Sequence, residues 1–60
     1  MTWGEVIRAL QKAGFKEDRT GKGSHRRFVH ADGRFVWVTV HRSRESGALG
    51  YRILKDAGIT

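Results

Sequence analysis

The chain has 60 residues, 12 of them Lys or Arg against 6 Asp or Glu, which gives a formal net charge of +6, and it contains neither cysteine nor proline. This length allows a single domain, which we expect to span residues 1–60, and the lack of cysteine excludes disulfides and Cys-based zinc knuckles. No apolar run approaches the roughly 18 residues of a membrane span, and the N-terminus lacks a signal-peptide pattern, so we expect a cytoplasmic protein without membrane contact. The excess of Arg, whose planar fork pairs with phosphate oxygens, indicates a nucleic-acid partner.

The first predicted element is a helix at about residues 3–13. Thr2 and Glu5 have the spacing of a capping box, in which each side chain bonds the other's backbone N–H. Gly14 is expected to end the helix, because glycine tolerates the left-handed conformation that follows many helices. One apolar stripe at helical spacing is formed by Trp3, Val6, Ile7 and Leu10.

Three strands are predicted next, at about residues 15–19, 24–30 and 34–40, from their β-branched and aromatic content and the glycines between them. Gly33 suits the left-handed position of a three-residue hairpin loop. A second helix, ending at Gly58, is marked by Leu49, Ile53, Leu54 and Ala57. The predicted fold class is therefore α+β, in the order α-β-β-β-α, with a three-stranded antiparallel sheet and two helices on one of its faces.

The hairpin loop also predicts which strand residues share a face. A three-residue loop pairs Phe28 with Val36 and Arg26 with Val38, and side chains alternate along each strand. The face for the helices then carries Phe28, Val36, Val38 and Val40. The opposite face carries His25, Arg27, Val29, Phe35, Trp37, Thr39 and His41. Exposed aromatics beside Arg suit RNA bases and phosphates, but they suit a protein interface or simple packing across strands as well.

Histidine is the candidate for chemistry, because the chain has no cysteine nucleophile and no close carboxylate cluster of the kind that holds Mg²⁺. His25 and His30 have opposite parity on one strand, so they are expected on opposite faces. His41 shares the face of His25 and is its diagonal neighbour if His25 lies opposite Thr39. A zinc site there needs a third ligand, and none is evident, so we predict neither a metal site nor a cofactor.

His25 has the most favourable surroundings of the three histidines. It follows a Gly-containing turn, and Lys22, Arg26 and Arg27 are close in sequence. An imidazole loses its proton near pH 6.5 and can therefore accept one from an RNA 2′-hydroxyl, whose oxygen then attacks the adjacent phosphorus without a metal. Taken alone, the pattern is equally that of an ordinary surface histidine.

Several segments together resemble the HicA toxin family, and the resemblance covers nearly the whole chain. They are Lys12-Ala13-Gly14-Phe15, Gly23-Ser24-His25 with Phe28, Asp32-Gly33-Arg34, Val38-Thr39-Val40-His41 and Ile53-Leu54-Lys55-Asp56-Ala57-Gly58-Ile59. The resemblance implies the fold of a double-stranded-RNA-binding domain, a ribonuclease that cleaves mRNA and blocks translation, and a HicB-type antitoxin as partner. The family's active-site histidine falls on His25. Thr is common in the family where this chain has Ala48, which removes a possible cap of the second helix.

We therefore predict a metal-independent endoribonuclease toxin with His25 as the general base. The residues expected to contact single-stranded RNA or mRNA are Lys22, Gly23, Ser24, Arg26, Arg27, Trp37 and His41. The strand pleat turns Arg26 toward the helices, which makes Arg27 the better-placed phosphate ligand, and His41 is a candidate general acid. Two alternatives stay open: a non-catalytic RNA-binding module of the same fold, and a protein that docks a partner on its aromatic sheet face.

Overall fold

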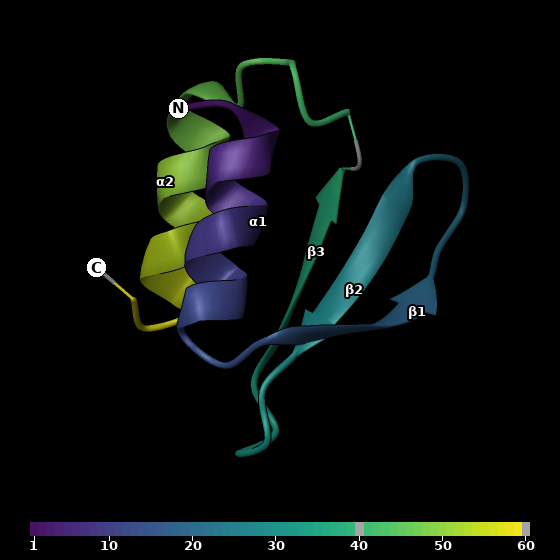
Figure 1. Ribbon diagram of the computed structural model, residues 1–60, viewed down its shortest axis with the longest axis vertical. Helices are drawn as coiled ribbons and strands as arrows, with labels where there is room; N and C mark the ends of the chain where they lie inside the picture. Colours follow the sequence, from purple (N-terminus) through teal and green to yellow (C-terminus); the bar gives the residue numbers. More distant parts are fainter. Residues whose placement is uncertain (40, 60) are drawn as a thin grey trace.

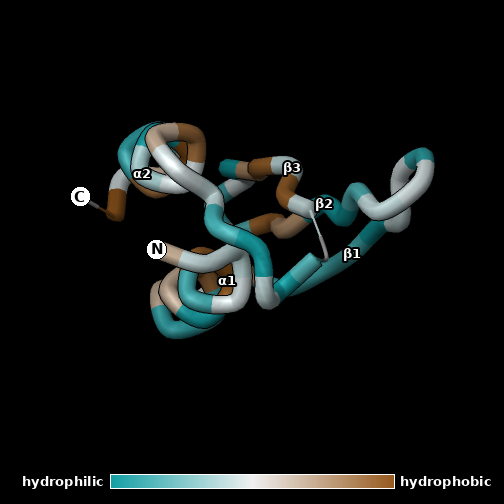
Figure 2. Tube along the Cα trace, turned by 90° about the horizontal axis from the view of Figure 1, so that it is seen from above, coloured by the Kyte–Doolittle hydropathy of each residue, from teal (hydrophilic) through white to brown (hydrophobic). Residues whose placement is uncertain are grey.

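The computed structural model describes residues 1–39 and 41–59. In chain order its elements are α1 (Trp3–Lys12), β1 (Lys16–Thr20), β2 (His25–Val29), β3 (Phe35–Thr39) and α2 (Gly47–Asp56). The sheet has the order β1-β2-β3 with both pairs antiparallel. The two helices lie together on one side of the sheet and leave its other face open (Figures 1 and 2). The predicted α+β class and the order α-β-β-β-α are confirmed.

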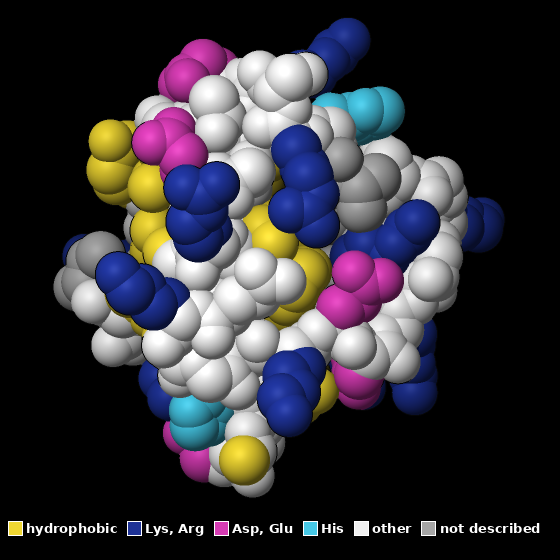
Figure 3. Space-filling view, viewed as in Figure 1, with side chains coloured by type: hydrophobic (Ala, Val, Ile, Leu, Met, Phe, Trp, Pro, Cys, Tyr) yellow, Lys and Arg dark blue, Asp and Glu magenta, His cyan; other side chains and the backbone are white. Residues whose placement is uncertain are grey.

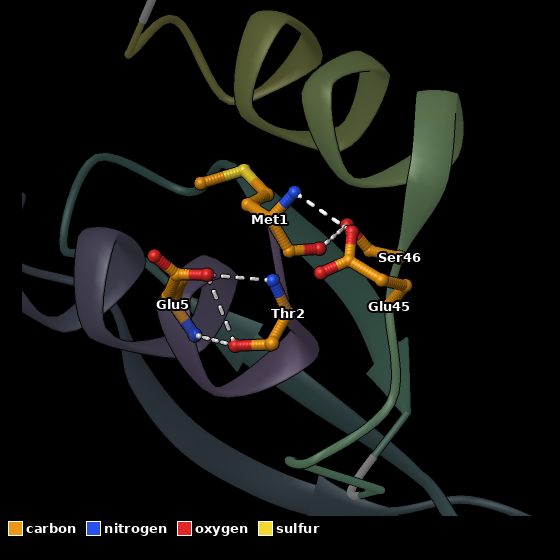
Figure 4. Close-up of polar contacts among 5 residues, drawn as sticks. All are labelled: Met1, Thr2, Glu5, Glu45 and Ser46. Atoms are coloured by element: carbon orange, nitrogen blue, oxygen red, sulfur yellow. Dashed lines mark hydrogen bonds and ion pairs between the residues drawn. The ribbon is translucent and has the colours of Figure 1, made fainter.

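Helix α1 begins and ends where the sequence predicts, to within one residue. Thr2 and Glu5 form the complete capping box: the Glu5 N–H donates to Thr2 Oγ1 at 3.2 Å, and the Thr2 N–H donates to Glu5 Oε1 at 2.7 Å (Figure 4). At the other end the Phe15 N–H donates to the Leu10 carbonyl at 2.9 Å, and Gly14 has a φ of +97°. This Schellman arrangement stops the helix at Lys12 and turns the buried Phe15 back under it.

The segment between β3 and α2 ties the starts of the two helices together. The Trp3 and Gly4 N–H groups donate to the carbonyls of Arg44 and Arg42 at 2.9 and 3.0 Å. The Met1 ammonium lies 3.0 Å from Glu45 Oε2, and the Ser46 hydroxyl donates to the Met1 carbonyl at 2.9 Å (Figure 4). The first N–H donors of α1 are thus satisfied within the chain, as buried or half-buried helix ends require.

The core lies between the helices and the sheet. Its buried side chains are Trp3, Val6, Ile7, Leu10, Phe15, Phe28, Val38, Leu54 and Ala57. The predicted hairpin register is confirmed, with Phe28 opposite Val36 and Arg26 opposite Val38, and Gly33 has a φ of +99°. Val40, which was expected on the same face, lies outside the described residues.

The prediction for α2 needs one correction. Leu49 was expected in the apolar stripe, but its side chain is 54% exposed, and Gly50 is buried in its place. A Cβ at Gly50 would clash with the Ser46 side chain and would also lie 3.0 Å from Val6 Cγ2, so the glycine makes room both for Ser46 and for the approach of α1. The helix begins at Gly47, and Ser46 makes no side-chain cap there.

The predicted strand bounds were slightly off: β1 has the predicted length but starts one residue later, after Phe15, β2 is one residue shorter at each end, and β3 starts one residue later than predicted. Of the two helices in the described part of the chain, neither has the length and apolar character needed to cross a membrane.

Candidate functional site

The loop between β1 and β2 fixes the start of the strand that carries His25. The Gly21 N–H donates to the His25 carbonyl at 2.9 Å, and the His25 N–H donates to the Lys22 carbonyl at 3.2 Å. Gly23 has a φ of +61°, which few other residues adopt at low cost. The loop is therefore a tight turn, with the exposed Lys22 at its tip and the exposed His25 as the first residue of β2.

Hydroxyl groups gather beside His25 on the open face of the sheet. Thr39 lies opposite His25 in the β2–β3 pair, as the register predicted. Its hydroxyl donates to Ser24 Oγ and accepts from the His41 N–H, at 3.4 Å in each case. These distances make both bonds weak. They nevertheless bring Ser24 and the backbone of His41 to Thr39, opposite His25; Thr39 was expected on this face but without a role.

Arg27, two residues along from His25 on the same face, is held by a carboxylate. Its Nε and one terminal nitrogen donate to the two carboxyl oxygens of Asp18 at 2.9 and 2.6 Å. The hydrogen bonds from the guanidinium lower the pKa of Asp18, and the same contact raises the pKa of Arg27. The guanidinium carbon also lies 5.3 Å from the ring centroid of Phe35. Arg27 is thus already paired, which the sequence did not predict.

A bulge in β1 places Arg19 beside Arg27 together with Asp18. Glu17 pairs with Phe28, whereas Arg19 pairs with Arg27, so Asp18 is an extra residue in β1. Without the bulge, strand alternation would put Asp18 directly opposite Arg27 and would send Arg19 to the side of the helices. With it, Asp18 and Arg19 both lie near Arg27 on the open face. Nothing in the sequence signals this extra residue.

Two further candidate residues do not share the open face with His25, although an Arg26 terminal nitrogen donates to the His25 carbonyl at 3.3 Å. Arg26 points to the helix side, as the pleat predicted, with its Nε 3.3 Å from Glu17 Oε2. His30, at the far end of β2, accepts a hydrogen bond from the Asp32 N–H at 3.1 Å, and its ring meets Phe15 edge to face with centroids 5.2 Å apart. The prediction that His25 and His30 do not act together is therefore confirmed.

Both aromatic residues of β3 are exposed on the open face, as predicted: Phe35 by 55% and Trp37 by 41%. Arg27 lies over Phe35, whereas the Trp37 ring lies against Gly21 in the β1–β2 loop. Charge alone does not single out this face, because Lys and Arg side chains are also spread over the face seen in Figure 3. Within residues 1–39 and 41–59, no three His, Asp or Glu side chains come together in a way that could hold a metal ion.

The fold and this face define a small basic α+β domain with an open sheet carrying histidine, hydroxyl, cationic and aromatic side chains. The family model for the HicA toxin of bacterial toxin–antitoxin systems matches residues 3–59. The chain therefore belongs to the HicA toxin family, as the sequence resemblance predicted. Membership of this family implies a cognate antitoxin as partner. No curated protein gives a significant match to the chain.

Proposed function

We propose that this toxin is an endoribonuclease that cleaves mRNA, with His25 as its general base and without a metal ion. The observation that carries the proposal is the place of His25 in a chain of this toxin family: it is exposed, on the open sheet face, at the end of a tight glycine-containing loop and opposite Thr39. An imidazole in that position is accessible to an RNA strand and can accept a proton at neutral pH.

The chemistry needs little beyond a base and a positive environment. His25 takes the proton of a 2′-hydroxyl, the 2′-oxygen bonds to the adjacent phosphorus, and the bond from phosphorus to the 5′-oxygen breaks. The 5′-oxygen receives a proton from His41 or from water, and the products carry a 2′,3′-cyclic phosphate and a 5′-hydroxyl. No metal has to supply the nucleophile, because the nucleophile belongs to the substrate.

The cations near His25 differ in how available they are for the phosphate. Lys22 is exposed at the loop tip, next to the backbone of Gly23 and Ser24, and is the first candidate to stabilise charge on the phosphoryl oxygens. Arg27 lies on the open face with His25, but its guanidinium has to release the Asp18 carboxylate, or bind it and the phosphate together. Arg26 is paired with Glu17 on the helix side, which makes it the weakest of the three candidates.

The antitoxin in this proposal is of the HicB type and acts by covering the open face. The free toxin leaves His25, Phe35 and Trp37 accessible, and these are the groups that a blocking partner has to bury. Exposed aromatic side chains also suit the core of a protein interface.

The decisive experiment incubates the purified protein with a fluorescent single-stranded RNA in EDTA, beside His25→Ala. His30→Asn is the matched control, because it removes a histidine from the same strand while keeping an acceptor for the Asp32 N–H. We expect cleavage by the wild type and His30→Asn, cyclic phosphate ends, no cleavage by His25→Ala, and no cleavage of an all-DNA strand.

Binding of RNA without cleavage by any of the proteins would replace this proposal with the non-catalytic RNA-binding module. Cleavage that EDTA abolishes would remove the metal-independent mechanism. If the protein neither binds nor cleaves RNA, the toxin acts through a protein target instead.

A further inference from the structure

The ring of Trp37 packs on the backbone of Gly21 so closely that no side chain fits between them. A Cβ built on Gly21 would lie 2.6 Å from Trp37 Cζ3 and 3.3 Å from both Cε3 and Cη2. Carbon atoms in proteins do not approach to 2.6 Å without a bond, so any larger residue at position 21 has to displace the ring or the loop. The φ of Gly21 is not in the left-handed region, so the close approach, and not the backbone angle, is what requires glycine here.

In the described residues, few hydrogen bonds hold this loop. From Gly21 to Ser24 the loop contains only Gly, Lys and Ser, so it supplies no apolar side chain of its own. Its described contacts are the two backbone hydrogen bonds between Gly21, Lys22 and His25 and the long contact from Thr39 to Ser24. The indole of Trp37 is the large side chain that lies against Gly21 in the described residues.

We propose that Trp37 is a positioning residue that holds the β1–β2 loop in place beside His25, and that it does not stack on an RNA base. The Gly21 N–H donates to the His25 carbonyl, so the ring fixes the Lys22–Ser24 segment relative to the imidazole through that bond. This proposal gives Trp37 a different role from the RNA contact expected from its exposure, and it leaves Phe35, with Arg27 above it, as the aromatic available to a base.

The first test does not need activity, so it stands even if the proposed ribonuclease function fails. Amide hydrogen exchange of Gly21 and His25, followed by NMR, is compared in the wild type, Trp37→Leu and Phe35→Leu. Phe35→Leu is the matched control, because it truncates an exposed aromatic on the same strand and the same face. We expect faster exchange at Gly21 and His25 in Trp37→Leu alone, with the amides of α1 and α2 unchanged. Equal exchange in the two variants would overturn the proposal.

The second test rests on the proposed function and uses a double-mutant cycle with Gly21→Ala. Displacement of the loop is expected to lower kcat for RNA cleavage on the order of 10–100-fold in Gly21→Ala or in Trp37→Leu, with a smaller change in KM. Once the ring is gone, the added methyl group has nothing to clash with, so Gly21→Ala/Trp37→Leu should be no slower than Trp37→Leu. Trp37→Phe, which keeps a flat ring, should recover most of kcat. Effects that multiply in the double variant would contradict the proposal.

A spectroscopic measurement separates positioning from stacking. Trp3 is 8% exposed and in the core, so added RNA is expected to change mainly the emission of Trp37. With an uncleavable 2′-O-methyl RNA, we expect little quenching of tryptophan fluorescence at saturation. Strong quenching that disappears in Trp37→Leu would show base stacking and overturn the positioning role.

Discussion

At the scale of single residues, the most consequential contact on the open face is the pairing of Arg27 with Asp18. The carboxylate uses two donors of the guanidinium fork, the same donors that would take a phosphate. Asp18→Asn removes that competition. At about 0.1 M salt we expect it to tighten RNA binding roughly fivefold and to steepen the salt dependence by about 0.7 in log–log slope, the contribution of one added phosphate contact to a single strand.

Fluorescence anisotropy with the uncleavable RNA over a series of salt concentrations measures both effects. The matched control is Asp56→Asn, which changes the net charge equally but lies at the end of α2. Weaker RNA binding by Asp18→Asn would mean that the carboxylate holds Arg27 in its RNA-binding position. An equal gain in RNA affinity in Asp56→Asn would show that the effect comes from net charge alone.

The same pair predicts how stability depends on pH. The pKa of Asp18 is lowered in the folded chain, chiefly by the hydrogen bonds from Arg27. A lowered pKa means that the pair stabilises the fold fully above the ordinary Asp value of about 3.9, and that this contribution is lost as the pH falls through the lower folded value. We expect the urea midpoint to fall between about pH 5 and pH 2, and to fall less in Asp18→Asn. Parallel curves for the two proteins would show that the pair does not contribute.

At the scale of secondary-structure elements, Arg34 joins the β2–β3 hairpin to the end of α2. Its Nε donates to Asp32 at 2.7 Å, a terminal nitrogen donates to the Ala57 carbonyl, and its guanidinium carbon lies 5.4 Å from the ring centroid of Phe15. A cation at a helix C-terminus also interacts favourably with the helix dipole. Arg34→Ala should therefore lower the free energy of unfolding by about 1 kcal/mol.

Urea unfolding measures this loss, with Arg52→Ala as the control, since Arg52 is an exposed Arg within α2. Similar effects of the two substitutions would show that the contacts of Arg34 add nothing beyond its charge.

Those parts of the fold that depend on local chemistry were predictable from the sequence. The capping box of Thr2 and Glu5, the glycine after α1 and the three-residue loop at Gly33 follow from rules that involve only a few neighbouring residues. The register between β2 and β3 followed from that loop, and with it the placement of His25 opposite Thr39.

The parts that depend on approach between distant segments were not predictable in this way. Gly50 carries no apolar side chain, so a hydrophobic pattern favoured Leu49, although Gly50 is the residue that lies against Ser46 and Val6. The bulge at Asp18 brings Arg19 to the open face of the sheet without any turn signal. The contact of Trp37 with Gly21 likewise joins β3 to the β1–β2 loop, and the sequence of neither segment alone predicts it.

At the scale of the whole molecule, a thin core and a large charge point to a protein that works with a partner. Only nine buried hydrophobic side chains form the core cluster of the described residues, and the chain carries a net charge of +6. A ligand that binds only the folded state adds to its stability, by about 2.7 kcal/mol at a concentration one hundred times its Kd. A HicB-type antitoxin with an acidic contact surface would supply that stabilisation and relieve the repulsion among the cations.

The proposed blocking mode predicts which face the antitoxin covers, and lysine acetylation followed by mass spectrometry can locate it. Lys22 lies in the loop beside His25, whereas Lys12 and Lys55 lie in the last turns of α1 and α2. In the toxin–antitoxin complex we expect Lys22 to be protected and Lys12 and Lys55 to react as they do in the free toxin. Modification of His25 by diethyl pyrocarbonate should slow in parallel with that of Lys22. Protection of both helix lysines with Lys22 still reactive would place the antitoxin on the helices, where it inhibits without covering His25.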